Sequence, residues 1–150
     1  MLELGHRTDR HPPFRYAAYT RVGFSDTDAQ GVVYYGRYLP YFDLARTEYH
    51  RQLGAVEVEG SQFVMRASQV DYLAPARFDD LLEVFVRIGR IGRSSVNYLY
   101  AVHHVDEDSG DTLMVTASQT LVLIDQATRQ PLPVPGRFRE RVSAFEETRF

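Results

Sequence analysis

One amphipathic helix followed by four strand-like runs is the pattern that most constrains how this chain folds. Between Arg37 and Leu53, apolar residues recur at spacings of three and four, which places them on one face of a helix. These residues are Leu39, Phe42, Ala45, Tyr49 and Leu53. Pro40 is tolerated in a first helical turn, and Gly54 is a typical helix stop. Such an apolar stripe needs a sheet face to cover it.

The rest of the chain has the composition and the alternation of antiparallel strands. A first strand is predicted over residues 15–24, and four more follow the helix at residues 61–73, 81–91, 95–105 and 112–124. Turn segments rich in Gly, Pro and Asp separate the later strands. This order predicts an α+β fold in which a five-stranded antiparallel sheet wraps around one long helix. A short charged helix is expected over residues 137–146.

The length of 150 residues suits a single domain. Residues 1–13 are predicted to be a flexible leader, closed by Pro12 and Pro13, and residues 14–150 a single domain. The net charge of -3 provides no broad positive field, which argues against a nucleic-acid partner.

Cysteine usage and hydropathy indicate where the protein works. The chain has no cysteine, which excludes disulfides, thiolate metal sites and a cysteine nucleophile and fits a reducing compartment. Its first ten residues lack the apolar stretch of a secretory signal, and no run approaches the ~20 apolar residues of a membrane span. We therefore expect a cytoplasmic protein without membrane insertion. No histidine pair has metal-ligand spacing with a carboxylate, so no metal site is predicted.

The segment between the first strand and the helix contains the strongest chemical signal. Asp26 and Asp28 lie two residues apart, shortly before the helix. A carboxylate there can act as a nucleophile or general base, while free backbone N–H groups at the helix start can stabilise an oxyanion. The alternative is that the two aspartates only form a turn and a cap. Composition alone leaves both interpretations open.

Two stretches resemble a known family. Residues 21–54, RVGFSDTDAQGVVYYGRYLPYFDLARTEYHRQLG, are similar to the signature of the 4-hydroxybenzoyl-CoA thioesterase family, including its bacterial acyl-CoA thioesterase branch associated with the Tol-Pal envelope system. Residues 70–81, VDYLAPARFDDL, resemble the family's second characteristic stretch. The resemblance implies a hot-dog fold and a homodimer, or a dimer of dimers, with active sites at the dimer interface.

The resemblance also assigns roles to residues of the loop. The family's catalytic aspartate corresponds to Asp28, and the backbone N–H groups that polarise the thioester carbonyl correspond to Tyr35 and Gly36. Asp26 is then a loop-organising residue. The envelope-associated branch commonly has histidine where this chain has Tyr35, so a catalytic histidine is not carried over. Asp28 would either form a mixed anhydride with the acyl group or activate a water molecule.

Three residues near the turn at 89–92 are candidates for binding the phosphates of CoA. Arg90, Arg93 and Ser94 match the basic and hydroxyl residues that family members place near this strand junction. The alternative is an ordinary solvated hairpin turn. Glu48 on the central helix is expected to be structural. No cofactor is expected apart from coenzyme A as part of the substrate.

The resulting hypothesis is an acyl-CoA thioesterase, acting on an acyl-CoA or an acyl carrier protein thioester. The alternative is a hot-dog module that binds acyl-CoA without turnover. A hot-dog dehydratase is disfavoured because the matched segment lacks the histidine that this chemistry requires.

Overall fold

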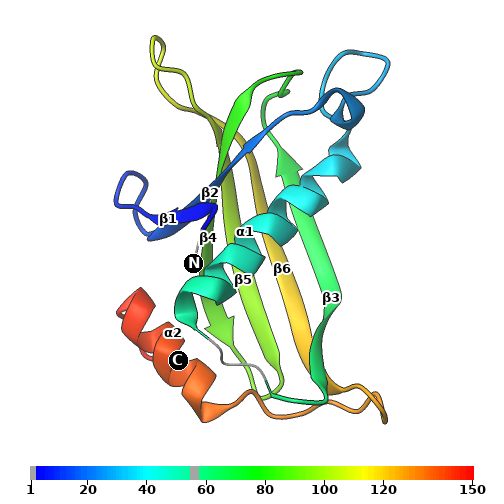
Figure 1. Ribbon diagram of the computed structural model, residues 1–150, viewed down its shortest axis with the longest axis vertical. Coiled ribbons are helices and arrows are strands. Elements are labelled where there is room, and N and C mark those ends of the chain that lie inside the picture. The colour runs from blue at the N-terminus through cyan, green and yellow to red at the C-terminus, as the bar shows by residue number, and fades with distance from the viewer. Residues whose placement is uncertain (1–2, 55–57) are drawn as a thin grey trace.

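A six-stranded antiparallel sheet curves around one long helix in the computed structural model, which describes residues 3–54 and 58–150 (Figure 1). The strands lie in the order β1-β2-β4-β5-β6-β3. Their bounds are β1 (Gly5–Arg7), β2 (Tyr16–Arg21), β3 (Ser61–Tyr72), β4 (Leu81–Ile91), β5 (Ser95–His104) and β6 (Thr112–Asp125). The predicted α+β hot-dog architecture is therefore confirmed, with one strand more than expected.

Helix α1 (Tyr38–Leu53) crosses the concave face of the sheet. Two 3-10 turns, η1 (Phe24–Asp26) and η2 (Tyr35–Arg37), precede it. Gly54 ends the helix with a φ of 88°, a value that glycine adopts without steric cost. The predicted bounds of the helix are thus met within one residue.

The core lies between α1 and the sheet positions that face it. Phe42 stacks on Tyr100 with ring centroids 4.6 Å apart, and both side chains are buried. Val84 and Val86 of β4 pack in the same cluster, because alternate residues of a strand face the same side. The opposite face of the sheet carries a smaller apolar cluster that includes Phe85.

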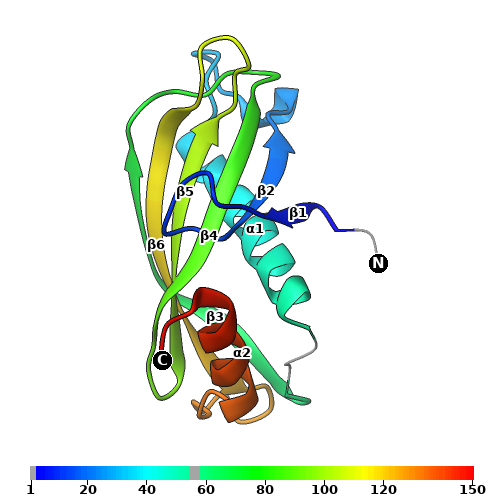
Figure 2. The same ribbon diagram turned by 90° about the vertical axis from the view of Figure 1, so that its left-hand side faces the viewer.

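The expected flexible leader differs from what the structure shows. Strand β1 pairs with β2, although ordered structure was expected to begin near Phe14. His6 of β1 contacts the buried Glu83 carboxylate at 2.7 Å, and Arg10, beyond β1, donates a hydrogen bond to the same carboxylate at 2.6 Å. This segment crosses the sheet in Figure 2. The composition of residues 1–13 did not predict this ordered segment, because the partner of His6 and Arg10 is Glu83 on β4, far along the chain.

Helix α2 (Gly136–Glu146) closes the end of the fold where α1 stops (Figure 1). The hydroxyl of Tyr49 on α1 donates to Glu146 at 2.5 Å, and the N–H of Ile88 on β4 donates to the same oxygen at 3.1 Å. Burial raises the pKa of Glu146, against the opposing effect of these hydrogen bonds. Among the described residues, neither helix is long and apolar enough to cross a membrane.

Candidate active site

The loop that connects β2 to α1 is held to the start of the helix by Asp26. Its carboxylate accepts hydrogen bonds from the N–H of Gly23 at 2.9 Å, the hydroxyl of Tyr41 at 2.8 Å and Nε of Arg37 at 3.1 Å. Partial burial opposes ionisation, but these donors lower the pKa of Asp26 below its ordinary value. Since Arg37 and Tyr41 belong to η2 and α1, Asp26 fixes the loop against the helix.

Asp28 occupies a tight turn two residues further along. Its backbone N–H donates to Val32 O at 2.9 Å, and its carbonyl accepts from the N–H of Gly31 at 3.0 Å. Gly31 has a φ of 78°, which favours glycine at this position. One carboxylate oxygen of Asp28 accepts from the N–H of Gln30 at 2.8 Å. Within residues 3–54 and 58–150 the other oxygen has no hydrogen-bond or ion-pair partner, so it is free to act on a ligand.

The helix start supplies two backbone donors beside this turn. The N–H of Tyr34 donates to Asp26 O at 2.9 Å, which brings the residue before η2 next to the aspartate loop. The next two N–H groups, of Tyr35 and Gly36, have no acceptor among the described residues, as expected for the first residues of a helix. The same short segment therefore presents a carboxylate and two unused donors.

Aromatic side chains from two elements surround the helix start. Tyr35 is 61% exposed, and its ring lies 4.3 Å from that of Tyr34 and 6.3 Å from that of Tyr72 at the end of β3. The Tyr72 hydroxyl donates to Tyr35 O at 3.0 Å. The end of β3, an edge strand of the sheet, thus contacts the segment that carries the candidate oxyanion donors.

Arg90 lies apart from the aspartate loop, in a depression that spans four strands. The depression has a volume of about 530 Å³, and Arg66, Ala67, Arg90, Ser95, Asn97 and Thr120 line it. Two guanidinium groups beside hydroxyl and amide groups form a surface suited to phosphate.

Arg93 and Ser94 do not line this depression. They sit in the β4–β5 turn, where their carbonyl oxygens accept from the N–H groups of Val134 at 2.7 Å and Leu123 at 2.8 Å respectively. The guanidinium of Arg93 donates to the Ser94 hydroxyl at 3.4 Å. The structure therefore divides the three residues that the sequence grouped as phosphate ligands.

Comparison with known proteins places the chain in a family. Residues 22–142 match the Thioesterase-like superfamily. The chain belongs to this superfamily. An acyl-CoA thioester hydrolase YbgC of Escherichia coli is 34% identical over 119 residues, which cover 77% of this chain and 86% of that protein. An acyl-CoA thioesterase YbgC of Helicobacter pylori is 30% identical, over 83% of this chain and 97% of that protein.

A solved structure shows the shared thioesterase fold. A mutant 4-hydroxybenzoyl-CoA thioesterase in complex with 4-hydroxybenzoyl-CoA superposes with a TM-score of 0.79. The match covers 85% of this chain and 97% of that protein, at 20% sequence identity. The hot-dog fold is therefore common to both.

Sequence reasoning missed several residues of the Arg90 depression and of the helix start. Arg66, Asn97 and Thr120 join Arg90 only because β3, β6, β5 and β4 are neighbours in the sheet. Tyr72 meets Tyr35 across 37 positions of sequence. Residue spacing gives no signal for either contact.

Two further candidates concern Glu48 and metals. Glu48 is buried on α1, where its carboxylate accepts from the N–H of Leu4 at 3.4 Å and pairs with Arg51 at 3.4 Å. It thus contacts the N-terminal segment and its own helix. In the part of the chain that the structure describes, no three His, Asp or Glu side chains gather in a way that could hold a metal ion.

Proposed function

We propose that this thioesterase-superfamily protein hydrolyses acyl-CoA thioesters to a free acid and CoA, with Asp28 as the reacting carboxylate. One observation carries the proposal. Among the described residues, one carboxylate oxygen of Asp28 has no partner, and the loop that carries it leads to two N–H groups at the helix start that have no acceptor. The names of the E. coli and H. pylori relatives support the same reaction.

In the proposed mechanism, the thioester carbonyl oxygen accepts hydrogen bonds from the N–H groups of Tyr35 and Gly36. These donors stabilise the negative charge that develops on that oxygen when the carbonyl carbon is attacked. Asp28 either attacks the carbon itself, giving a mixed anhydride that water later hydrolyses, or takes a proton from an attacking water. The thiolate of CoA leaves in both routes.

The nucleotide end of CoA would bind at the basic depression. Arg90, with Arg66 beside it, offers charge to the phosphates, and Ser95 and Thr120 offer hydroxyl groups. Arg93 and Ser94 remain candidates from the neighbouring turn. CoA enters as part of the substrate, and the reaction needs no further cofactor or metal. An acyl carrier protein thioester would present the same acyl-thioester end.

We further propose that the working form is a homodimer, or a dimer of dimers, in the cytoplasm, with residues 14–150 as its thioesterase domain. Strand β3 supports this assembly, because within residues 3–54 and 58–150 it pairs only with β6 and leaves its other edge open. Exposed Met65 and Tyr72 lie on this strand of 12 residues. A long open edge of this kind favours pairing with the same strand of another copy. Light scattering during size-exclusion chromatography measures the assembly.

The test is a panel of acyl-CoA substrates with a thiol reagent that reports released CoA. We expect turnover by the wild type and a loss of about 100-fold or more in kcat for Asp28→Asn, the range in which removal of an acid–base group falls. CoA affinity is expected to stay, because the substitution preserves side-chain volume.

Asp79→Asn is the control, since Asp79 is an exposed loop aspartate and asparagine tolerates its φ of 70°. Release of thiol at the wild-type rate by Asp28→Asn would contradict the assigned role of Asp28. A wild type that retains acyl-CoA without releasing thiol would instead support the alternative function, a binding module.

A further inference from the structure

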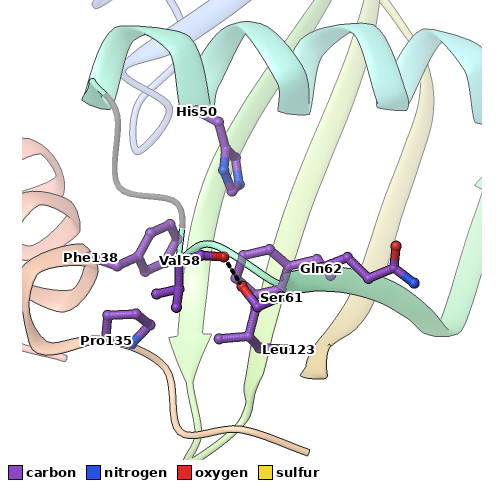
Figure 3. Close-up of a pocket in the computed structure, with 8 residues that line it drawn as sticks. His50, Val58, Ser61, Gln62, Leu123, Pro135 and Phe138 are labelled. Atoms are coloured by element: carbon purple, nitrogen blue, oxygen red, sulfur yellow. Dashed lines mark hydrogen bonds between the residues drawn. The ribbon is translucent and has the colours of Figure 1, made fainter. Parts of the chain in front are cut away.

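A cavity lies under the C-terminal end of α1 (Figure 3), whereas the loop that carries Asp28 precedes the N-terminal end of this helix. Its volume is about 240 Å³. Most of its lining is apolar, and the full set is His50, Val58, Ser61, Gln62, Phe63, Leu123, Pro135 and Phe138. The cavity thus has the character of a small-molecule pocket, with an apolar wall and few polar groups.

His50 is the polar side chain that hangs into this cavity from the helix (Figure 3). The Ser61 hydroxyl is already used, because it donates to Val58 O at 2.6 Å. The amide of Gln62 extends away from His50 in the same view. His50 is therefore the candidate side chain for a polar contact with a ligand in this cavity.

The hydrogen bonding of His50 leaves capacity for a ligand. Nε2 of His50 is paired with the Tyr98 hydroxyl, and the other ring nitrogen has no partner among the described residues. Burial, together with the guanidinium of Arg46 one turn earlier, lowers the pKa of His50 to about 4. The ring is consequently neutral near pH 7, and its second nitrogen can form one hydrogen bond with an uncharged group.

The Asp28 site of the same chain does not reach this cavity. At about 1.5 Å of rise per residue, His50 lies about 18 Å along the helix axis from Tyr38. The space between α1 and the sheet along that distance is filled by core side chains, including Phe42 and Tyr100. An acyl group attached at the helix start would have to pass through the packed core.

Pairing of two β3 edges brings the cavity to the Asp28 site of a second copy. Antiparallel pairing about the middle of β3 (Ser61–Tyr72) places Ser61 of one copy opposite Tyr72 of the other, with the strands about 4.8 Å apart. Ser61 lines the cavity, whereas Tyr72 donates to Tyr35 O at the helix start. In this pairing, the cavity of one copy and the helix start of the other would lie on either side of the paired strands.

We propose that this cavity binds the acyl group of a thioester held by Asp28 and the helix start of a second copy, and that His50 selects acyl groups with a hydrogen-bonding substituent far from the thioester. The proposal rests on the proposed thioesterase function and on the β3 dimer. Apolar cavities of about 150 Å³ admit benzene, so 240 Å³ suits a substituted ring or a medium-length chain.

The first experiment compares matched acyl-CoA pairs that differ only by a distal hydroxyl, such as octanoyl-CoA and 8-hydroxyoctanoyl-CoA. The readout is the ratio of kcat/KM for the hydroxylated to the plain substrate. Since one net hydrogen bond contributes about 0.5–1.5 kcal/mol, we expect His50→Leu to lower this ratio about 3- to 10-fold. His50→Gln, which keeps a hydrogen-bonding group, should retain part of the preference.

Thr47→Ala is the matched control on the same helix, because Thr47 is exposed and lies outside the cavity lining. It should leave the ratio unchanged. Thermal unfolding of each variant separates loss of fold from loss of selectivity. A ratio that His50→Leu leaves at the wild-type value would overturn the assignment of His50.

The second experiment asks which chain supplies the cavity. Co-expression of Asp28→Asn and His50→Leu chains with different affinity tags yields mixed dimers. In a mixed dimer, the intact Asp28 and the intact His50 are on different chains. If the cavity of one copy binds the acyl group held by Asp28 of the other, one of the two sites in the mixed dimer contains both intact Asp28 and intact His50. The mixed dimer then shows the wild-type ratio of kcat/KM.

A mixed dimer with the His50→Leu ratio would mean that the cavity serves its own chain, and the proposal would be wrong. Failure of the proposed function itself looks different, because then the wild type releases no thiol from either substrate or the Asp28→Asn homodimer remains active.

Discussion

Replacing Asp26 by asparagine should destabilise the protein much more than the same replacement at Asp28. The Asp26 carboxylate accepts from three donors, on Gly23, Arg37 and Tyr41, which connect the loop, η2 and α1. Asp28 accepts a single hydrogen bond from the N–H of its neighbour Gln30. An asparagine carbonyl oxygen can keep that one bond, whereas no asparagine satisfies three donors with one acceptor oxygen as well as a carboxylate does.

The size of the effect follows from the kind of hydrogen bonds that are weakened. Bonds to a charged group contribute about 1.5–3 kcal/mol each, and asparagine retains part of this as a neutral acceptor. A net loss of about 1–3 kcal/mol is expected for Asp26→Asn. For a domain of this size, about 2–4 °C of Tm accompanies each kcal/mol, so Tm should fall by about 2–12 °C. Asp28→Asn should shift Tm by about 1 °C or less.

The difference between wild type and Asp26→Asn should also depend on pH. The pKa of Asp26 is lowered in the folded protein, so its carboxylate contributes stability above the ordinary carboxyl pKa of the unfolded chain. That contribution is lost as the pH falls through the folded pKa. The Tm gap should therefore be full at pH 7 and shrink in acid.

Thermal unfolding by circular dichroism, at pH 7 and at steps down to the acid limit of the fold, measures both quantities. Asp28→Asn serves as the control, because it removes the same charge from the same loop. Equal Tm losses in the two variants would refute the reasoning. So would a gap for Asp26→Asn that stays constant as the pH falls through the acid range.

Two further predictions concern the sheet. Arg66→Ala and Arg90→Ala should each raise KM for acyl-CoA about 3- to 10-fold, since exposed arginines contribute modestly to phosphate binding. KM for S-acyl pantetheine, which lacks the nucleotide, should stay unchanged. An equal rise in KM for both substrates would contradict a phosphate role. Glu83→Gln should lower the free energy of unfolding in urea by about 1–3 kcal/mol, because it replaces the charged acceptor of the Arg10 and His6 hydrogen bonds by a neutral one. Hydrogen exchange of the β1 amides should become faster, and slow exchange in the variant would argue against this anchor.

Local pattern was sufficient to predict the long helix and the four strands that follow it. The helix periodicity between Arg37 and Leu53 is set by a face that packs on the sheet, and the structure has α1 at Tyr38–Leu53. The four later strands were predicted within one residue of their observed ends. Burial on one face imposes a repeat on consecutive residues, and such a repeat is visible in sequence.

The contacts that build the candidate site depended on long-range pairing and were not predictable in this way. Arg66 and Arg90 meet through the order of four strands, and β1 is held by Glu83 on β4. The leader was expected to be flexible because two prolines and several charges follow one another in it. Those charges are instead satisfied by partners that are distant in sequence, for which neighbouring residues carry no signal.

Tyr35 is compatible with the proposed thioesterase site, although the sequence resemblance led us to expect histidine at this position in one branch. The proposed oxyanion donor at this position is the backbone N–H, which every residue except proline supplies. The Tyr35 ring contacts Tyr34 and Tyr72, and its carbonyl accepts from the Tyr72 hydroxyl. The side chain therefore belongs to the contact between the helix start and β3. Because β3 is also the proposed dimer edge, variation at this position would affect how the two copies join around the substrate, while the proposed chemistry would rest on Asp28 and main-chain donors.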